Sequence, residues 1–168
     1  MKAILAAALS LVLSSLAHSD VPANPQEAEL RQVVSEFFTA LRESDIDKAM
    51  TFMLPAPEEY APYVRAELTE FSDHVVNGEF PFRVFEKSLV VHDTYAGILV
   101  SDPFKPSEIP NEKCYFKFHD GKWLTLPDVG YNSVLIDLSK EDQRAFMLVK
   151  RGLKKRLNLF LTRSVCKQ

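Results

Sequence analysis

The apolar residues of this 168-residue chain change their spacing once, near residue 82. Between residues 25 and 77 they recur every three or four positions, which is typical of helices with one buried face. From residue 82 to residue 126 they form short β-branched and aromatic runs separated by turn residues, which is typical of antiparallel strands. Helices followed by hairpins predict a mixed α+β domain.

Three helices are expected before the strands. The first opens at residues 24–27, where a capping Asn, a Pro and a Glu follow one another, and its apolar face extends to Leu41. A short second helix follows Ser44-Asp45 and ends before Pro55, and a third covers residues 62–77. Strands are expected near residues 82–91, 94–101, 113–119 and 122–126, with a further short strand at residues 134–136.

The clearest local signal is Asp120-Gly121 between two aromatic runs. This dipeptide favours a two-residue hairpin, because both central positions of that turn take a positive φ. In the resulting register Phe118 faces Trp123 and Phe116 faces Thr125, and we expect the aromatic residues on this face to be buried. The opposite face, with Tyr115, Lys117, Leu124 and Leu126, is more mixed and is expected to be partly exposed.

The two ends of the chain differ in character. Residues 1–19 have a basic start, an apolar run from Ala3 to Leu16 and small residues before Asp20, which predicts a cleaved signal peptide and a secreted or periplasmic protein. An uncleaved anchor is the alternative, although the run is too short to span a bilayer. The remaining chain fits one domain over residues 20–138, followed by a C-terminal helix and tail over residues 139–168.

The C-terminal segment is basic and amphipathic. From residue 140 onward it holds nine Lys or Arg and two Asp or Glu, whereas residues 20–139 hold ten and twenty-one. We expect its apolar stripe to pack on the domain while the basic residues face solvent, and the alternative is a segment that binds a membrane surface or a partner. The stripe consists of Phe146, Val149, Leu153, Leu157 and Phe160.

Sequence motifs for catalysis are missing. The chain has no Gly-rich phosphate loop, no G-x-S-x-G sequence and no pair of His or Cys with metal-ligand spacing, so no cofactor or metal is expected. Its net charge of −3 argues against nucleic acid as a partner. His92-Asp93 and His119-Asp120 have the residue types of an oriented base, but neighbouring strand residues point to opposite faces and both pairs fall at predicted turns.

Two short motifs resemble the nuclear transport factor 2-like superfamily. Residues 37–50 (FFTALRESDIDKAM) are similar to its first helix, turn and short second helix, and residues 118–123 (FHDGKW) to a late strand pair of its secreted bacterial members. The resemblance implies a curved antiparallel sheet wrapped around the long helix, with a pocket at its open end, and a cystatin-like domain is the alternative. The C-terminal helix is an addition to that pattern.

The resemblance also identifies positions to inspect for chemistry. Ketosteroid-isomerase-like members place a Tyr and an Asp where this chain has Phe37 and, near the second position, Ala61, so that chemistry is not expected. The leading interpretation is a non-catalytic binding domain for a small apolar ligand or a protein partner. The alternatives are a small lyase or isomerase that uses His92 or His119 with a carboxylate, and an envelope-surface protein held by its basic helix. The pocket candidates are aromatic, with core filling as the competing role: Phe37, Phe38, Phe71, Tyr95, Phe116, Phe118 and Trp123.

The only two cysteines are Cys114 and Cys166. If the chain is exported, it meets oxidising conditions, and a single intrachain pairing is then available. We therefore expect a disulfide that ties the C-terminal segment to a hairpin strand, with a buried, reduced Cys114 as the alternative.

Overall fold

The structure is a computed structural model that describes residues 25–78, 81–105, 108–126 and 139–165. Helices alone occupy the first part of the chain, and strands follow, which confirms the predicted α+β class. The helices are α1 (Pro25–Arg42), α2 (Ile46–Thr51), α3 (Ala61–Asn77) and α5 (Lys140–Val165). The strands are β1 (Val84–His92), β2 (Tyr95–Val100), β3 (Glu112–His119) and β4 (Lys122–Thr125).

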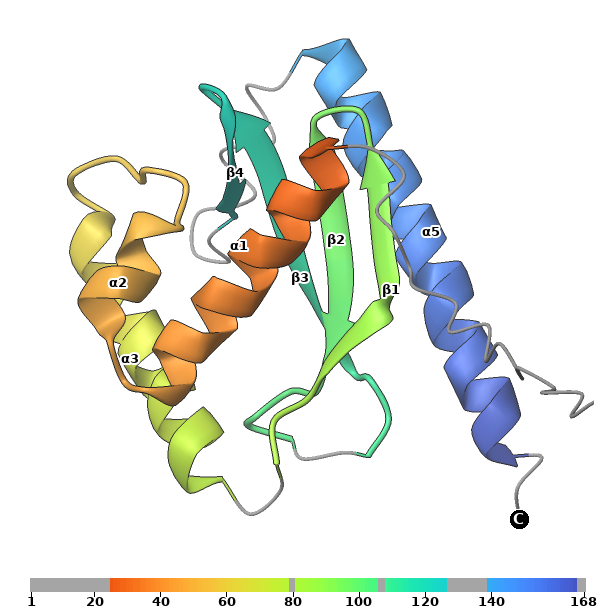
Figure 1. Cartoon of the computed structure of the whole chain (residues 1–168), viewed down its shortest axis with the longest axis horizontal. Coiled ribbons are helices and arrows are strands. Elements are labelled where there is room, and N and C mark those ends of the chain that lie inside the picture. Colours follow the sequence, from red (N-terminus) through yellow and green to blue (C-terminus); the bar gives the residue numbers. More distant parts are fainter. Residues whose placement is uncertain (1–24, 79–80, 106–107, 127–138, 166–168) are drawn as a thin grey trace, which may run out of the picture.

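The sheet lies between two helical layers (Figure 1). Its strands are antiparallel and run in the order β1-β2-β3-β4, so every connection is to the next strand along the chain. The three N-terminal helices pack on one face, and α5 runs along β1 and β2 on the other. Since both faces are covered, every residue of β2 is buried.

The Asp120-Gly121 hairpin forms in the predicted register. Asp120 and Gly121 both have positive φ angles, of 49° and 80°, as the turn requires. Phe118 pairs with Trp123 and Phe116 with Thr125. Trp123 is buried, and its indole nitrogen donates a hydrogen bond of 2.9 Å to the Gln26 carbonyl oxygen at the start of α1. The hairpin is thereby fixed against the first helix.

The sheet separates two apolar cores. The first lies under α1 and α3 and includes Phe38, Leu68, Ile98, Phe116 and Trp123. The second lies under α5 and is built on residues of the opposite parity, because neighbouring strand residues point to opposite faces. Its members are Tyr95, Leu99, Leu126, Ala145, Phe146, Val149 and Leu153.

The predicted packing of α5 is confirmed, and it corrects one expectation about the sheet. Phe146, Val149 and Leu153 are buried against the sheet, with Leu157 and Phe160 partly buried beside them. The sheet face that was expected to be partly exposed is therefore more covered than predicted. Leu124 and Leu126 are buried, although Tyr115 and Lys117 stay half-buried.

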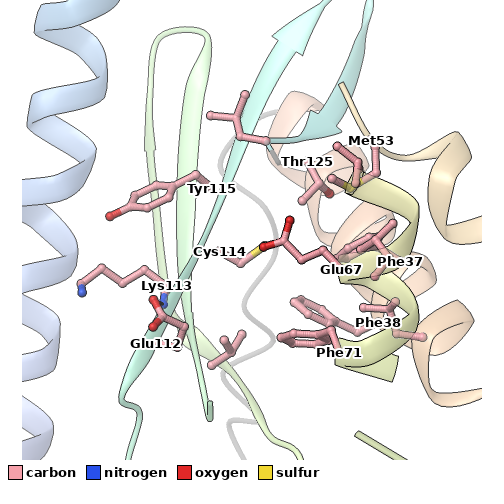
Figure 2. Close-up of a pocket in the computed structure, with 15 residues that line it drawn as sticks. Phe37, Phe38, Met53, Glu67, Phe71, Glu112, Lys113, Cys114, Tyr115 and Thr125 are labelled. Carbon is pink, nitrogen blue, oxygen red and sulfur yellow. Dashed lines mark hydrogen bonds between the residues drawn. The ribbon is translucent and has the colours of Figure 1, made fainter. Parts of the chain in front are cut away.

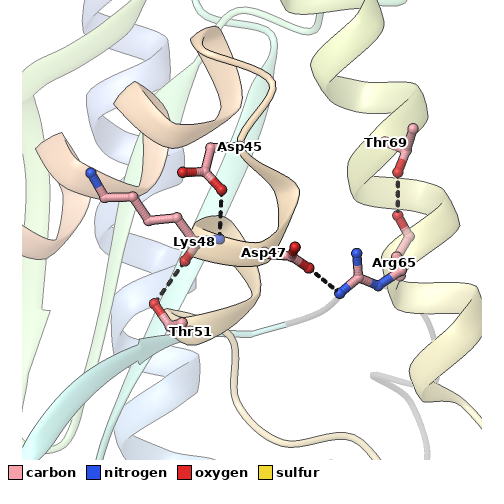
Figure 3. A network of polar contacts seen from close by, with 6 residues as sticks. All are labelled: Asp45, Asp47, Lys48, Thr51, Arg65 and Thr69. Carbon is pink, nitrogen blue, oxygen red and sulfur yellow. Dashed lines mark hydrogen bonds and ion pairs between the residues drawn. The ribbon is translucent and has the colours of Figure 1, made fainter.

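Polar contacts fix the spacing of the N-terminal helices (Figure 3). Asp45 caps α2 by accepting a hydrogen bond of 3.0 Å from the Lys48 backbone nitrogen, and Asp47 on α2 pairs with Arg65 on α3. On the buried side, the Ser72 hydroxyl donates a 2.7 Å hydrogen bond to the Leu41 carbonyl oxygen, which joins α3 to the end of α1. These contacts hold α1 and α3 as two fixed walls above the sheet.

Some predictions fall outside the described residues. They are the cap at Asn24, the strand at residues 134–136, the signal peptide and Cys166. Among the helices that the structure does describe, none combines the length and the apolar character needed to cross a membrane.

Candidate functional site

A pocket opens between α1, α3 and the β3–β4 side of the sheet (Figure 2). Phe37 and Phe38 come from α1 because they fall on the face that packs toward the sheet, and Phe71 comes from the facing side of α3. The cavity measures about 100 Å³. An engineered apolar cavity of about 150 Å³ holds benzene, so this smaller cavity takes at most a single ring or a short chain.

The walls are mostly apolar. Besides the three phenylalanines, the apolar lining residues are Leu41, Met53, Val64, Leu68, Val100 and Leu126. Phe37 and Phe38 meet edge to face, with ring centroids 5.1 Å apart, and this packing holds both rings in place. Such walls favour an apolar ligand, because binding removes the apolar surface of the ligand from water.

Thr125 is the polar group that the walls enclose most completely. It lies at the end of β4 and is 3 % exposed, and its side-chain hydroxyl has no hydrogen-bond partner among the described residues. A buried hydroxyl without a partner costs free energy that a ligand group could recover.

Both backbone hydrogen-bonding groups of Thr125 have partners. Its nitrogen donates to the Phe52 carbonyl oxygen at 2.7 Å, and its carbonyl oxygen accepts from the Leu54 nitrogen at 2.8 Å. Residues 52–54 thus add a short parallel bridge to the edge of β4. These contacts fix the position of the Thr125 side chain.

Five further polar residues line the pocket, namely Glu67, Glu112, Lys113, Cys114 and Tyr115. Figure 2 shows Glu67 of α3 pointing across toward Cys114 of β3, whereas Tyr115 and Lys113 point toward α5. Glu67 and Cys114 are half-buried. A carboxylate at this position disfavours an anionic ligand, because two like charges in a poorly solvated site repel each other.

The seven aromatic candidates divide between the two faces of the sheet. Phe37, Phe38 and Phe71 line the pocket as predicted. Phe116 and Trp123 are buried in the first core and Phe118 packs against it, so these three fill the core and are absent from the lining. Tyr95 lies in the second core, since it begins β2 with its ring toward α5.

Tyr95 sets a specific pH dependence. Burial, and then the nearby Asp142 carboxylate, raise the pKa of Tyr95 well above its usual range. An unfolded tyrosine ionises near pH 10, so above that pH the folded state holds more protons than the unfolded state and stability falls as pH rises. The loss is expected to approach about 1.4 kcal/mol per pH unit above pH 10.

The Tyr95→Phe variant is expected to lose stability less steeply than the wild type between pH 9 and pH 11. Urea unfolding at pH 8, 9.5 and 10.5 measures the difference. Tyr63→Phe is the matched control, because Tyr63 is 64 % exposed and should keep the wild-type slope. Equal slopes for wild type and Tyr95→Phe would contradict the assignment of Tyr95 to a buried, neutral site.

The two His-Asp pairs lie at hairpin turns, away from the pocket. His92 Nδ1 is 3.3 Å from Asp93 Oδ2, and His119 Nε2 is 3.4 Å from Asp120 Oδ2. All four side chains are exposed, and none of them lines the pocket. The described residues therefore bring neither histidine to an enclosed site.

Cys114 lies on the pocket side of β3, and the sheet stands between its side chain and α5. Cys166 is outside the described residues, so the Cys114–Cys166 disulfide stays a prediction. Among the described side chains no cluster of three or more His, Cys, Asp or Glu is arranged to hold a metal ion.

Several pocket residues were not identified from the sequence, namely Met53, Val64, Glu67, Leu68, Cys114 and Thr125. For Thr125 a signal existed: the hairpin register places it opposite Phe116, which puts a hydroxyl on an otherwise apolar face. Glu67 carried no such signal, because its place depends on how α3 packs against the sheet.

Comparisons with known proteins assign neither a family nor a function to this chain. The chain matches no family model, and no curated protein or solved structure shows significant similarity to it.

Proposed function

We propose that this chain is a non-catalytic binding protein that holds a small, neutral, mostly apolar molecule between α1, α3 and the sheet. One observation carries the proposal: an apolar pocket lined by Phe37, Phe38 and Phe71 contains the buried hydroxyl of Thr125, which has no partner among the described residues. The ligand would bring one hydrogen-bonding group to that hydroxyl. Glu67 argues against a carboxylate ligand such as a fatty acid.

Two sequence expectations extend the proposal. The signal-like pattern of residues 1–19 leads us to propose that the protein is exported and meets its ligand outside the cytoplasm. A pocket between a long helix and an antiparallel sheet is also what the nuclear transport factor 2-like resemblance implies. The position where ketosteroid-isomerase-like members carry a Tyr is Phe37, a pocket residue without a hydrogen-bond donor, which favours binding over catalysis.

The proposal is tested with two probes of similar shape, benzyl alcohol and ethylbenzene. Each carries a single ring with a short substituent, and only benzyl alcohol carries a hydroxyl. The Thr125→Val variant keeps the shape of the side chain and removes its hydroxyl. We expect this change to weaken benzyl alcohol binding about 5- to 10-fold, since a hydrogen bond contributes roughly 1 kcal/mol net. Ethylbenzene binding should be unchanged or tighter.

Ligand-detected NMR or calorimetry measures the four affinities, and benzoate serves as the anionic control that should not bind. Leu68→Phe, which extends a larger side chain into the cavity, should block both neutral probes while circular dichroism shows an intact fold. Absence of saturable binding by either probe at millimolar concentration would contradict the pocket. An equal effect of Thr125→Val on both probes would contradict the role of the hydroxyl.

A further inference from the structure

The outward face of α5 carries a dense group of cations. Lys150, Arg151, Lys154 and Lys155, which we call the basic face, are all exposed and lie within two turns on one side of the helix. Among the described residues none of them forms an ion pair with a carboxylate. The chain has no Asp or Glu after Asp142. These cations are therefore not neutralised by the acidic body of the described protein.

The helix that carries the basic face is held firmly on the sheet. A Cβ atom added at Gly152 would lie 2.7 Å from Val90 Cγ1, so the helix backbone approaches β1 very closely. Phe146, Val149 and Leu153 are buried in the second core. Because this apolar stripe is already covered by the sheet, it is not available for insertion into a bilayer, and α5 presents its cations as a fixed surface.

Apolar side chains accompany the cations on the exposed surface. Met147, Leu159 and Leu161 are 47 %, 54 % and 42 % exposed. On the flank of the helix next to β1, Lys87 of β1 and Arg156 line a hollow of about 240 Å³ together with Leu159 and Phe160. Lys87 and Arg156 can bind the phosphate of a lipid, and the apolar side chains of Leu159 and Phe160 can contact its first acyl carbons.

We propose that the basic face docks the protein on an anionic lipid surface. Charge complementarity selects an anionic partner, and the exposed apolar residues favour a lipid surface over a purely polar polyanion. The shape agrees, because a straight helix of 26 residues, roughly 39 Å long, presents a ridge to a flat surface. The part of the chain before Lys140 has an excess of acidic residues, so an anionic surface repels it and the protein docks through α5. This inference is independent of the pocket and its ligand.

The test is co-sedimentation of the full chain with vesicles of equal parts phosphatidylglycerol and phosphatidylcholine. We expect binding in 50 mM NaCl, little binding in 500 mM NaCl, and little binding to pure phosphatidylcholine, because the attraction is screened by salt. Insertion through the apolar residues 3–16 would persist in high salt and in neutral vesicles. The salt-sensitive part of the binding is therefore the readout for α5.

A variant with Gln at Lys150, Arg151, Lys154 and Lys155 removes the four cations of the basic face and keeps good helix-forming residues. Its salt-sensitive partition coefficient should fall about 100-fold or more, since each cation near an anionic surface contributes roughly 1 kcal/mol. The matched control replaces four exposed cations elsewhere with Gln: Lys48, Arg83, Lys105 and Lys122. The control should retain most of the binding.

A milder variant, Lys154→Gln with Lys155→Gln, should lose about 30-fold and guards against misfolding of the larger one. Equal losses in the α5 variant and in the control would show a general charge effect and would overturn the proposal. So would the absence of binding by the wild type in 50 mM NaCl. If duplex DNA or polyglutamate at equal charge displaced the protein from the vesicles, the partner would be another polyanion and the lipid assignment would be wrong.

Discussion

Leu153→Ala is expected to lower the free energy of unfolding by about 2–5 kcal/mol, because it empties space in the second core. Leu153 is fully buried, and its Cδ1 atom occupies the hollow over Gly97 that a Cβ there would enter at 2.7 Å. Urea unfolding followed by far-UV circular dichroism measures the change. Leu159→Ala is the matched control, since that leucine on the same helix is 54 % exposed and should change stability by less than about 0.5 kcal/mol.

A double-mutant cycle shows whether Leu153 acts through Gly97. Gly97→Ala alone is expected to cost about 1–3 kcal/mol, because the new methyl group meets Leu153 and Val149. Shortening Leu153 removes the closest of these contacts, so the double variant should be more stable than the sum of the two losses predicts. Simple additivity would mean that α5 does not pack over Gly97 as described. A loss below about 1 kcal/mol for Leu153→Ala would mean that α5 is not part of the folded core.

Trp123→Ala is expected to lower the free energy of unfolding by about 3–5 kcal/mol, a large share of the 5–15 kcal/mol typical of a domain. Trp123 packs edge to face on Phe118, with ring centroids 5.4 Å apart, and bonds the Gln26 carbonyl oxygen. The variant loses both the packing and the link between β4 and α1. Far-UV circular dichroism in urea is the suitable measurement, because Trp123 is the only tryptophan in the chain.

Trp123→Phe separates the two contributions. It keeps most of the ring and leaves the Gln26 carbonyl oxygen without its indole donor, so a smaller loss of about 1–3 kcal/mol is expected. Phe104→Ala, at a half-exposed aromatic residue, is the control and should have a minor effect. If Trp123→Ala were no more harmful than Phe104→Ala, the hairpin would not lie against α1.

The elements of the fold could be predicted from local signals. Helical spacing predicts α1, α3 and α5. The turn at Asp120-Gly121, in which both residues take a positive φ, predicts the register of β3 and β4. That helices cover both faces of the sheet was harder to predict from the sequence. The uninterrupted apolar run of β2 is the one signal, because it indicates a strand buried on both sides. The burial of Leu126 was not predicted because it depends on α5, which is distant in sequence.

The candidate site was only partly predictable, for a physical reason. Phe37, Phe38 and Phe71 are recognisable as apolar, but the sequence does not separate an aromatic residue that lines a cavity from one that fills a core. Phe116 and Tyr95 illustrate this, since the first is core and the second lies on the other face. A cavity is a property of how whole elements pack, and the angle between α1, α3 and the sheet is set by contacts such as Ser72 to Leu41.

The central claim is that the pocket binds a small hydroxylated apolar molecule, and methyl NMR during a benzyl alcohol titration tests it most directly. The two cores provide an internal control, because they lie on opposite faces of one sheet. The account predicts saturable shifts of the Met53, Val64 and Leu68 methyl signals, with contacts between the ligand and the Thr125 methyl, while Val149 and Leu153 stay unchanged. Unchanged pocket methyls at saturating ligand, or shifts centred on Val149 and Leu153, would contradict it.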